Sequence, residues 1–297
     1  MAAQLEYERS VVVRADLAAV AELVAGRLTG ILAQLTAERE IVHVALTGGR
    51  GGAAVLQGIA AHPWRDNLDW SRVHLWWSDE RFVPEADPER NELQARNALI
   101  SQLNIPASNV HAIAASDAGL DLDAAADAYA GELAKFAPAG GDPWPSFDIT
   151  LLGVGPDGHY ASLFPERHEI HVTDRTALAV RDSPKPPPER VTLTRPVINA
   201  SQRVWLVLSG ADKAAVLGLA LAGASYAHVP AAGAKGRAST VSYVDEDAAS
   251  EVPASLIEQD EVFVVISGSG RVILDDGTVL PLAPGTLVRV PLGKREM

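Results

Sequence analysis

A glycine-rich segment near the middle of the chain carries the residues best suited to chemistry. Residues 147–152 form an apolar, partly β-branched run that predicts a buried strand, and glycines follow it at Gly153, Gly155 and Gly158. His159 comes next and is the one side chain there that titrates near neutral pH. Glycines let the backbone approach a ligand closely, and a neutral imidazole can take a proton from water. A structural turn with a satisfied histidine is the alternative interpretation of this segment taken alone.

A second glycine loop predicts an anion site. An apolar, β-branched strand leads into residues 47–52, and a helix is expected to begin near Ala53. The loop contains Gly48, Gly49 and Arg50. Backbone N–H groups at a helix start, aided by the helix dipole, favour a phosphate or a carboxylate. The spacing does not meet the dinucleotide fingerprint G-x-G-x-x-G, so we expect a phosphate or sugar phosphate there, with a plain tight turn as the alternative.

Charged side chains directly follow another predicted strand. The apolar residues 73–77 lead into Asp79, Glu80 and Arg81. In an open parallel sheet this position lies at the edge where ligands bind, although a solvated loop would also explain the charges. Arg81 can direct two N–H donors onto a phosphate, and a neighbouring carboxylate can hold that guanidinium or accept a hydrogen bond from a sugar hydroxyl.

Further cations follow two later strands. Residues 182–190 form a stiff, proline-rich segment that carries Lys185 and Arg190. This segment could be a linker, but two cations on it also suit an anion site. The buried strand predicted at 203–209 leads to Lys213 at the start of a helix. The sequence therefore places a cation at a second junction between a glycine and a helix.

Composition limits the class of protein and its partners. The chain has 297 residues, of which 47% are hydrophobic, and this suffices for a folded core. Its formal net charge of -13 argues against nucleic acid or an acidic membrane as a partner. It contains no cysteine, which excludes disulfides and cysteine-based zinc sites. A charged N-terminal segment and the interrupted uncharged run at 214–234 predict a cytoplasmic protein without a membrane partner.

These side chains need a scaffold that brings several strand ends together. A strand at 10–13 is followed by a helix that Asp16 caps and that runs towards Glu38, and small residues after His159 predict another helix start. Strand and helix patterns alternate at least five times up to Asp247. The strands are apolar and β-branched, as in a parallel sheet covered on both faces. We therefore expect an α/β fold, Rossmann-like, with an open, mainly parallel sheet and helices on both faces.

Four ordered motifs carry a resemblance that covers about residues 10–253. They read SDERFVP at 78–84, GVGPDGHYASLFP at 153–165, DSPKPPPERVTLT at 182–194 and VWLVLSGADKAAVL at 204–217. With these motifs the chain resembles the 6-phosphogluconolactonase family, in the superfamily of glucosamine-6-phosphate deaminase and ribose-5-phosphate isomerase. The resemblance implies hydrolysis of 6-phospho-D-glucono-1,5-lactone in the oxidative pentose phosphate pathway, with no redox cofactor and no obligatory metal. The chain departs from the family's frequent SGGSTP loop, because its own loop reads TGGRGG and contains Arg50.

Lactone hydrolysis gives each candidate residue an expected role. We expect neutral His159 to take a proton from water as it attacks C1, and then to return it to the ring oxygen. Asp157 or the loop backbone orients the ring in this hypothesis, and the backbone N–H groups of Gly153, Gly155 and Gly158 are candidates to stabilise the oxyanion. The remaining candidates form the expected binding site for the substrate and its phosphate: Gly48, Gly49, Arg50, Asp79, Arg81, Lys185, Arg190 and Lys213.

Two other functions remain open from the sequence. A sugar-phosphate isomerase or deaminase has a similar phosphate site and needs a carboxylate base near C1 and C2, which Asp79 or Glu80 could supply. A non-catalytic sugar-phosphate sensor is suggested by the altered glycine loop and the unusual C-terminus. In every case the expected partner is a small sugar phosphate, and for the hydrolase it is the lactone. We expect no metal or cofactor site, and a monomer or weak homo-oligomer.

The sequence predicts a domain boundary near residue 257. Residues 1–257 form the expected α/β domain, and residues 258–297 form a β-rich extension. Alternating hydrophobicity predicts a β-hairpin and a further strand there, at 271–274, 278–282 and 287–290. The extension resembles part of a cupin barrel, but it has no histidine, so the metal site of many cupins is not carried over.

Overall fold

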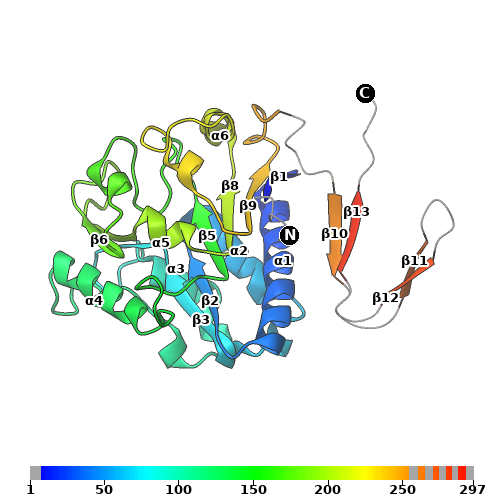
Figure 1. Ribbon diagram of the computed structural model, residues 1–297, viewed down its shortest axis with the longest axis horizontal. Coiled ribbons are helices and arrows are strands. Elements are labelled where there is room, and N and C mark those ends of the chain that lie inside the picture. Colours follow the sequence, from blue (N-terminus) through cyan, green and yellow to red (C-terminus); the bar gives the residue numbers. More distant parts are fainter. Residues whose placement is uncertain (1–7, 254–259, 265–269, 274–278, 283–286, 292–297) are drawn as a thin grey trace.

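A six-stranded parallel sheet forms the centre of the computed structural model, which describes residues 8–253, 260–264, 270–273, 279–282 and 287–291. The strands lie in the order β1-β9-β8-β5-β2-β3, and each neighbouring pair is parallel (Figure 1). Their bounds are β1 (Glu8–Arg14), β2 (Val42–Leu46), β3 (Val73–Trp77), β5 (Ile149–Gly153), β8 (Arg203–Leu208) and β9 (Ser239–Asp245). The α/β class is confirmed, and the sheet expected to be mainly parallel is parallel throughout.

The inner strands of this sheet have mostly apolar sequences and are buried. β3 reads VHLWW, and all five of its residues are buried. β8 reads RVWLVL and is buried at every position after the first. Strands covered on both faces show such runs instead of an alternating pattern. This continuity explains why the sequence alone located β2, β3, β5 and β8 close to their observed bounds. β9 was not predicted.

Six α-helices accompany the strands in the described part of the chain. They are α1 (Leu17–Glu38), α2 (Gly49–Ala61), α3 (Asn91–Ala98), α4 (Leu122–Ala134), α5 (Arg195–Asn199) and α6 (Ala214–Leu221). Short 3₁₀ helices are η1 (Arg65–Asn67), η2 (Trp70–Arg72), η3 (Ile100–Gln102), η4 (Ala107–Asn109), η5 (His168–His171), η6 (Ala211–Lys213) and η7 (Pro230–Gly233). Asp16 caps α1 as predicted, because its Oδ1 accepts a hydrogen bond from the N–H of Ala19 at 2.8 Å. α1 and α2 pack together; α1 contacts β9, and α2 contacts β5 and β8.

α1 is long and apolar enough to cross a membrane, judged by length and composition among the described residues. Its side chains Val24, Leu28 and Leu32 are nevertheless buried in the hydrophobic core. A core helix of an α/β body needs the same apolar residues on its inner face. Packing against α2 and β9 therefore accounts for the composition of α1.

A second, smaller sheet contains the charged segment after β3, for which a solvated loop was the alternative interpretation. β4 (Asp79–Arg81), β7 (Arg190–Leu193) and β6 (Ala177–Val180) form an antiparallel sheet in the order β4-β7-β6. In this register Arg81 pairs with Arg190. The partner strand lies more than a hundred positions later in the chain, so no local sequence pattern could predict the pairing.

Two helix starts also differ from the sequence expectation. α2 begins at Gly49 and not near Ala53, so most of the glycine loop forms its first turn. Gly52 allows this early start, because a Cβ there would lie 2.3 Å from the carbonyl oxygen of Thr47. The second difference is that no helix begins directly after His159, since residues 160–167 form bridges and turns.

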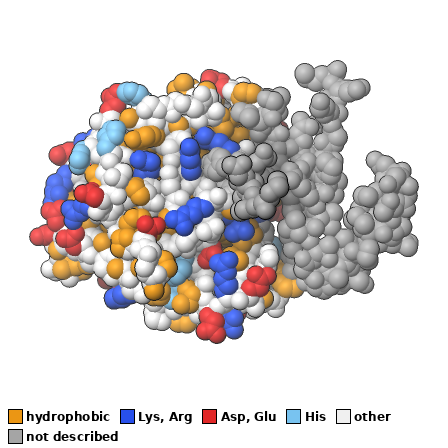
Figure 2. All heavy atoms as spheres, in the orientation of Figure 1, with side chains coloured by type: hydrophobic (Ala, Val, Ile, Leu, Met, Phe, Trp, Pro, Cys, Tyr) orange, Lys and Arg blue, Asp and Glu red, His pale blue; other side chains and the backbone are white. Residues whose placement is uncertain are grey.

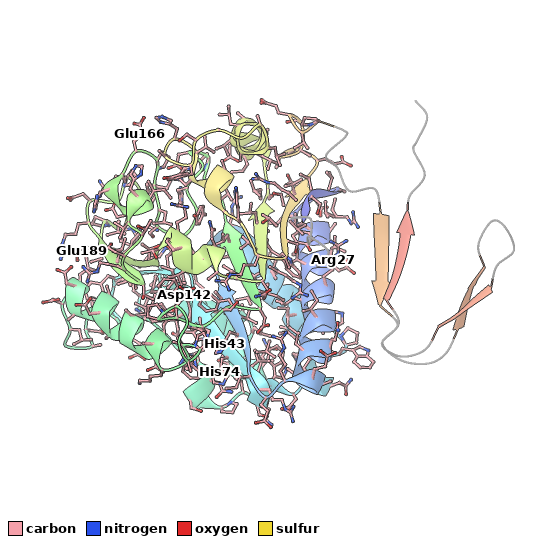
Figure 3. The ribbon with its side chains drawn as sticks, in the orientation of Figure 1. Arg27, His43, His74, Asp142, Glu166 and Glu189 are labelled. Carbon is pink, nitrogen blue, oxygen red and sulfur yellow. The ribbon has the colours of Figure 1, made fainter. Side chains whose placement is uncertain are left out.

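Three histidines form a buried cluster at the beginning of the central strands. His43 and His74 are the second residues of β2 and β3 (Figure 3), and their ring centroids lie 5.4 Å apart. His74 Nδ1 lies 2.9 Å from Nε2 of His111, whose ring stacks on Trp76 at 3.8 Å. Burial and the neighbouring histidines lower the pKa of His43 to about 3 and that of His74 to about 4. The cluster is therefore built to remain uncharged.

The C-terminal extension contains two antiparallel strand pairs. β10 (Asp260–Val264) pairs with β13 (Leu287–Pro291), and β11 (Gly270–Ile273) pairs with β12 (Val279–Leu282). The pairing of β11 with β12 confirms the strands of the predicted hairpin, whose turn lies outside the described residues. The resemblance to a cupin and the boundary at residue 257 stay predictions.

Candidate active site

A cavity of about 290 Å³ lies where β2, β3, β5 and β8 end. Parallel α/β sheets bind ligands at this carboxyl edge, because loops from several strands meet there. The predicted site residues that line it are Gly48, Gly49, Arg50, Asp79, Arg81, Gly153, Gly155, His159, Lys185, Arg190 and Lys213. Asp157 and Gly158 stand behind His159 in the same loop. The structure thus brings together five segments that the sequence had singled out separately.

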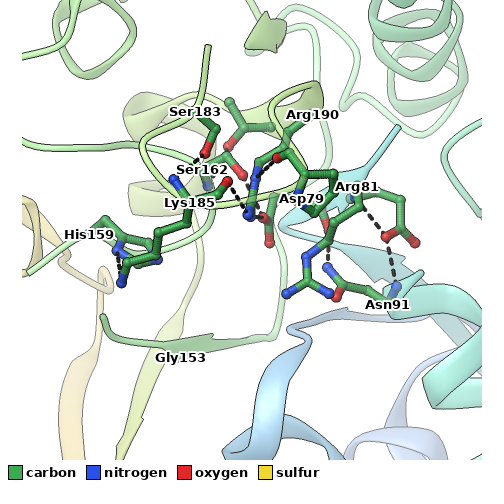
Figure 4. Close-up of polar contacts among 12 residues, drawn as sticks. Asp79, Arg81, Asn91, Gly153, His159, Ser162, Ser183, Lys185 and Arg190 are labelled. Carbon is green, nitrogen blue, oxygen red and sulfur yellow. Dashed lines mark hydrogen bonds and ion pairs between the residues drawn. The ribbon is translucent and has the colours of Figure 1, made fainter. Parts of the chain in front are cut away.

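His159, Asp157 and Lys185 form one polar group at an end of this cavity. Nδ1 of His159 lies 2.5 Å from Oδ1 of Asp157, and Nζ of Lys185 donates to the same carboxylate oxygen at 3.3 Å. Lys185 Nζ is also 3.4 Å from His159 Nδ1 (Figure 4). Burial alone would raise the pKa of Asp157, but the hydrogen bond and charge of His159 and the Lys185 ammonium hold it below its ordinary value. Because Asp157 occupies Nδ1, Nε2 is the imidazole nitrogen left for a water molecule.

Two glycines make room for this group. A Cβ on Gly155 would lie 2.1 Å from both Cε1 and Nδ1 of His159, so any other residue there displaces the ring. Gly158 has a φ of 84°, and a Cβ on it would also lie 2.7 Å from Cγ2 of Val216. That φ is one that side chains rarely adopt. The loop therefore needs glycine at these positions for the fit of His159.

The expected oxyanion role of the loop glycines is corrected by their hydrogen bonds. The N–H of Gly153 donates to Oγ1 of Thr47 at 3.1 Å. The N–H of Gly155 donates to the carbonyl of His159, and that of Gly158 donates to the carbonyl of Gly155, each at 2.9 Å. These donors hold the turn in shape, so none of the three is available to a ligand in this conformation.

Cations outnumber carboxylates around the cavity. Five basic side chains line it: Arg50, Arg81, Lys185, Arg190 and Lys213. Asp79 is the one carboxylate among the described lining residues. The whole chain has a net charge of -13, and Figure 2 shows many acidic side chains towards the rim of the face that it draws. The local excess of positive charge suits an anionic ligand.

The first turn of α2 adds N–H donors to this cationic lining. Its N-cap, Gly48, has no side chain to accept hydrogen bonds from these donors. Lys213 also lines the cavity, and its Nζ lies 2.6 Å from Oδ2 of Asp212. The Lys213 ammonium holds the pKa of the exposed Asp212 carboxyl below its ordinary value, with a smaller effect from Arg50. An uncapped helix N-terminus beside two cations is a suitable place for a phosphate.

Arg81 and Arg190, the two arginines of the small sheet in the cavity lining, already donate hydrogen bonds to backbone carbonyls. Arg81 donates from Nη1 to the carbonyl of Glu89 at 2.6 Å. Arg190 is 4% exposed and donates to the backbone carbonyls of the loop that carries Lys185. Their direct contact with a phosphate stays a prediction.

The two carboxylates after β3 have structural partners. Glu80 is 1% exposed, and its carboxylate accepts hydrogen bonds from the N–H groups of Arg81, Asn91 and Glu92 at 2.7 to 2.8 Å. Burial raises the pKa of Glu80 to about 7, against the opposing effects of Arg90 and the three N–H donors. Asp79 lines the cavity, and its Oδ2 accepts a hydrogen bond from Oγ of Ser162 at 2.7 Å. Glu80 therefore holds the start of α3 and does not face a ligand.

Asn91 belongs to the cavity lining although the sequence reasoning did not select it. Its side chain is buried against Gly48, where a Cβ would lie 1.8 Å from Oδ1 of Asn91. Nδ2 donates to the carbonyl of Asp79 at 2.9 Å. An asparagine at a helix start usually indicates a cap, so the signal was ambiguous. The close fit between Gly48 and Asn91 could be recognised only in three dimensions.

No group of three or more histidines and carboxylates within the described residues has the geometry to hold a metal ion.

The parallel sheet, the cation-lined cavity at its carboxyl edge and the histidine–aspartate pair define an α/β protein that binds a small anion next to a histidine able to act as a general base. The chain belongs to the family of glucosamine-6-phosphate isomerases and 6-phosphogluconolactonases, whose model matches residues 15–243. The match includes every predicted site residue and confirms the family that the motifs indicated. It ends before the C-terminal strands.

Several relatives are similar over most of their length. The chain is 50% identical to a 6-phosphogluconolactonase of Streptomyces coelicolor over 248 residues, which cover 82% of this chain and 95% of the relative. It is 49% identical to a 6-phosphogluconolactonase of Mycobacterium tuberculosis over 230 residues, which cover 77% and 92%. The crystal structure of a 6-phosphogluconolactonase from Thermotoga maritima matches with a TM-score of 0.69 and 28% identity, over 80% of this chain and 100% of that chain.

Proposed function

We propose that the protein hydrolyses 6-phospho-D-glucono-1,5-lactone to 6-phospho-D-gluconate, the lactonase step of the oxidative pentose phosphate pathway. Relatives that are 49% and 50% identical over nearly their whole length carry this activity in their names. The observation that carries the proposal is the contact of His159 with Asp157 and Lys185 inside a cationic cavity. This arrangement supplies a base next to a site for an anionic substrate.

His159 acts as base and then as acid. Asp157 accepts the hydrogen bond from Nδ1–H, so Nε2 carries the lone pair that takes a proton from water. The water oxygen bonds to C1, and the carbonyl electrons move onto the carbonyl oxygen. When the tetrahedral intermediate collapses, the bond between C1 and the ring oxygen breaks and Nε2–H returns the proton to that oxygen. The product is the open-chain acid, which ionises in water.

Lys185 is the cation nearest to this reaction. Its ammonium lies 3.3 Å from Asp157 Oδ1 and lines the cavity, so it can stabilise the negative charge that develops on the carbonyl oxygen. The loop glycines do not offer their N–H groups for this role, because those groups donate within the protein. We therefore assign Lys185 to the reacting end of the substrate.

The 6-phosphate binds at the first turn of α2. The turn has no side-chain cap, and Arg50 and Lys213 line the same cavity. Backbone N–H groups, the helix dipole and two cations together favour a dianion. Arg50, which replaces the hydroxyl of the family's frequent loop, thus adds a charge where a hydrogen-bond donor is missing.

The two competing functions have weaker support. An isomerase or deaminase needs a carboxylate base near C1 and C2, but Glu80 accepts three backbone hydrogen bonds and Asp79 holds Ser162. A non-catalytic sensor has no need for a histidine held by an aspartate beside the cavity. Neither function explains the whole site as lactone hydrolysis does.

The test measures hydrolysis of freshly generated lactone by the wild type and by His159→Ala, with spontaneous opening subtracted. We expect the variant to lose about 10²- to 10⁴-fold in kcat, because it lacks the base. His228→Ala is the matched control, since that histidine is exposed and pairs with Glu166. Near-native turnover by a folded His159→Ala variant would refute the mechanism.

Turnover of other substrates separates the remaining functions. The wild type is assayed in parallel with glucosamine 6-phosphate and ribose 5-phosphate. Rapid turnover of either, with none of the lactone, would establish the isomerase or deaminase function. Binding of 6-phosphogluconate without any turnover would establish the sensor.

A further inference from the structure

Arg190 is buried beside the cavity and uses its donors on the protein backbone. Its Nη2 donates to the carbonyls of Lys185 and Pro186, each at 3.1 Å, and its Nε donates to the carbonyl of Pro187 at 3.2 Å. The residue is 4% exposed, although the loop that it holds is largely at the surface. One guanidinium thus ties down three consecutive residues, of which the first is Lys185.

The same guanidinium also contacts Phe164, whose ring packs beside His159. Cζ of Arg190 lies 5.7 Å from the centre of the Phe164 ring, and that ring lies 4.6 Å from the ring of His159. Its Nη1 also lies 3.8 Å from Oδ2 of Asp79. Arg190 therefore contacts two neighbours of the histidine, the backbone of Lys185 and the ring of Phe164. Figure 4 shows Arg190 beside the loop that carries Lys185.

These contacts form a closed cycle that runs from Arg190 to Lys185, to His159, to Phe164 and back to Arg190. Lys185 reaches Asp157 and His159 from a loop that contains three prolines in a row and is largely exposed. Lysine is flexible, so the position of its ammonium depends on where its backbone is held. The three carbonyl contacts of Arg190 fix that backbone next to the carboxylate.

We propose that Arg190 is a positioning residue for catalysis, which sets the Lys185 ammonium and the Phe164 ring against His159. It acts through these two groups and does not carry the 6-phosphate. The inference rests on the proposed lactonase function. It gives Arg190 a positioning role, whereas the sequence analysis expected this residue to bind the phosphate. Reacting groups misplaced by about 1 Å cost on the order of 100-fold in rate, so a loosened Lys185 has a measurable effect.

The experiment compares Arg190→Lys and Arg190→Ala with the wild type in lactone turnover and in binding of 6-phosphogluconate. We expect kcat to fall by about 10- to 100-fold in both variants, because neither side chain can hold three carbonyls at once. KM and the dissociation constant of 6-phosphogluconate should change less than about threefold, because the phosphate is held elsewhere. A rise of tenfold or more in both constants, with kcat unchanged, would show that Arg190 binds the phosphate and would overturn the proposal.

A double-mutant cycle with Lys185→Met tests the route of the effect. If Arg190 acts mainly through Lys185, adding Arg190→Lys to Lys185→Met lowers kcat by less than about threefold further. Guanidinium ion added to Arg190→Ala should restore part of kcat, and it should restore none in the Arg190→Ala/Lys185→Met double variant. Fully multiplicative losses without rescue would contradict the proposal.

A matched control distinguishes general loosening of the loop from a specific positioning effect of Arg190. Arg167 also donates to backbone carbonyls of this segment, from Nη1 to Asp182 and from Nη2 to Arg181, but it does not line the cavity. Arg167→Ala should change kcat by less than about threefold, whereas an equal loss in Arg167→Ala would count against a specific role of Arg190. Circular dichroism and melting confirm folding, and Arg190→Lys serves if Arg190→Ala unfolds. Absence of lactone turnover in the wild type would defeat the proposed function, whereas the Arg190 results above concern this inference alone.

Discussion

At the reacting end of the cavity, one carboxylate serves two partners. Asp157 binds His159 Nδ1 and Lys185 Nζ with the same oxygen, and its pKa lies below its ordinary value as a result, although burial acts in the opposite direction. It therefore keeps its charge throughout the neutral range. A fixed negative charge behind the imidazole selects the tautomer that leaves Nε2 free, and it favours the imidazolium formed during the reaction.

Asp157→Asn should lower kcat by about 10- to 10³-fold, because a neutral amide neither stabilises the imidazolium nor enforces one tautomer. KM should change little, since Asp157 stands behind His159. The check is a set of rate profiles between pH 5 and 9 for wild type and variant.

The pH dependence of stability provides a second readout for this substitution. The lowered pKa of Asp157 means that its stabilising effect is present above its unfolded value of 3.8 and is lost as the pH falls through the lower folded value. Asp157 is about one third exposed, so the loss at pH 7 should stay within about 1 kcal/mol. Equal kcat values for the wild type and Asp157→Asn would contradict the catalytic role assigned to Asp157.

At the scale of elements, the loop after β5 depends on its glycines for shape. Gly155→Ala should lower kcat by at least about 10-fold, because the added methyl group would occupy the position of the His159 ring. The backbone φ of Gly155 is not in the left-handed region, so the loss arises from the collision with the ring. Lactone turnover and the melting temperature of the variant give the measurement.

Gly131→Ala provides the matched comparison. Gly131 lies within α4, is exposed, and has no atoms within 4 Å of the position of an added Cβ. This substitution should leave kcat unchanged and stabilise the protein by about 0.5–1 kcal/mol through helix propensity. If both substitutions left activity intact, the steric role of Gly155 would be wrong.

At the scale of the whole molecule, the histidine cluster makes stability depend on pH. The pKa values of His43 and His74 are lowered to about 3 and about 4, so the unfolded chain binds protons below pH 6.5 while the folded chain does not. Stability is therefore fully present above pH 6.5 and falls as the pH decreases towards 4. We expect the free energy of unfolding to drop by on the order of 1–3 kcal/mol between pH 7.5 and 5. Urea unfolding at both pH values measures it.

His43→Gln separates this effect from general acid sensitivity. The variant cannot gain the charge, so its stability should change less with pH than that of the wild type, even if it starts lower because Trp76 Nε1 has lost Nδ1 of His43 as its acceptor. Parallel curves for wild type and variant would assign the pH dependence to other groups.

Much of the central fold could be predicted because its strands are locally distinctive. The runs that form β2, β3, β5 and β8 are apolar and end in glycine or charged residues, so both their existence and their carboxyl edge could be inferred. β4 was missed because three charged residues indicate a loop unless a distant partner pairs with them. Here β7 is that partner, and it is far away in the sequence.

The site was predictable at the level of motifs but not of partners. The sequence singled out Asp157 and His159 in one segment and Lys185 in another, and the structure brings the three within hydrogen-bond distance. The carbonyl contacts of Arg190 could not be inferred, because they depend on how the proline loop returns alongside β7. The same holds for the glycine N–H groups, whose acceptors are set by the shape of the turn.

The neighbouring positions of β1 and β9 have a consequence for biosynthesis (Figure 1). Among the described strands of this sheet β1 comes first along the chain, yet it pairs with β9, which lies more than two hundred residues later. β9 also pairs with β8. One edge of β1 and one edge of β8 therefore stay unpaired until β9, which ends at Asp245, has been synthesised. Exposed edges of this kind invite wrong pairing while the chain is incomplete. Completion of the sheet is therefore a late event for the nascent chain, and chaperones that shield open strands should matter more for this protein than for one that pairs its strands in order of synthesis.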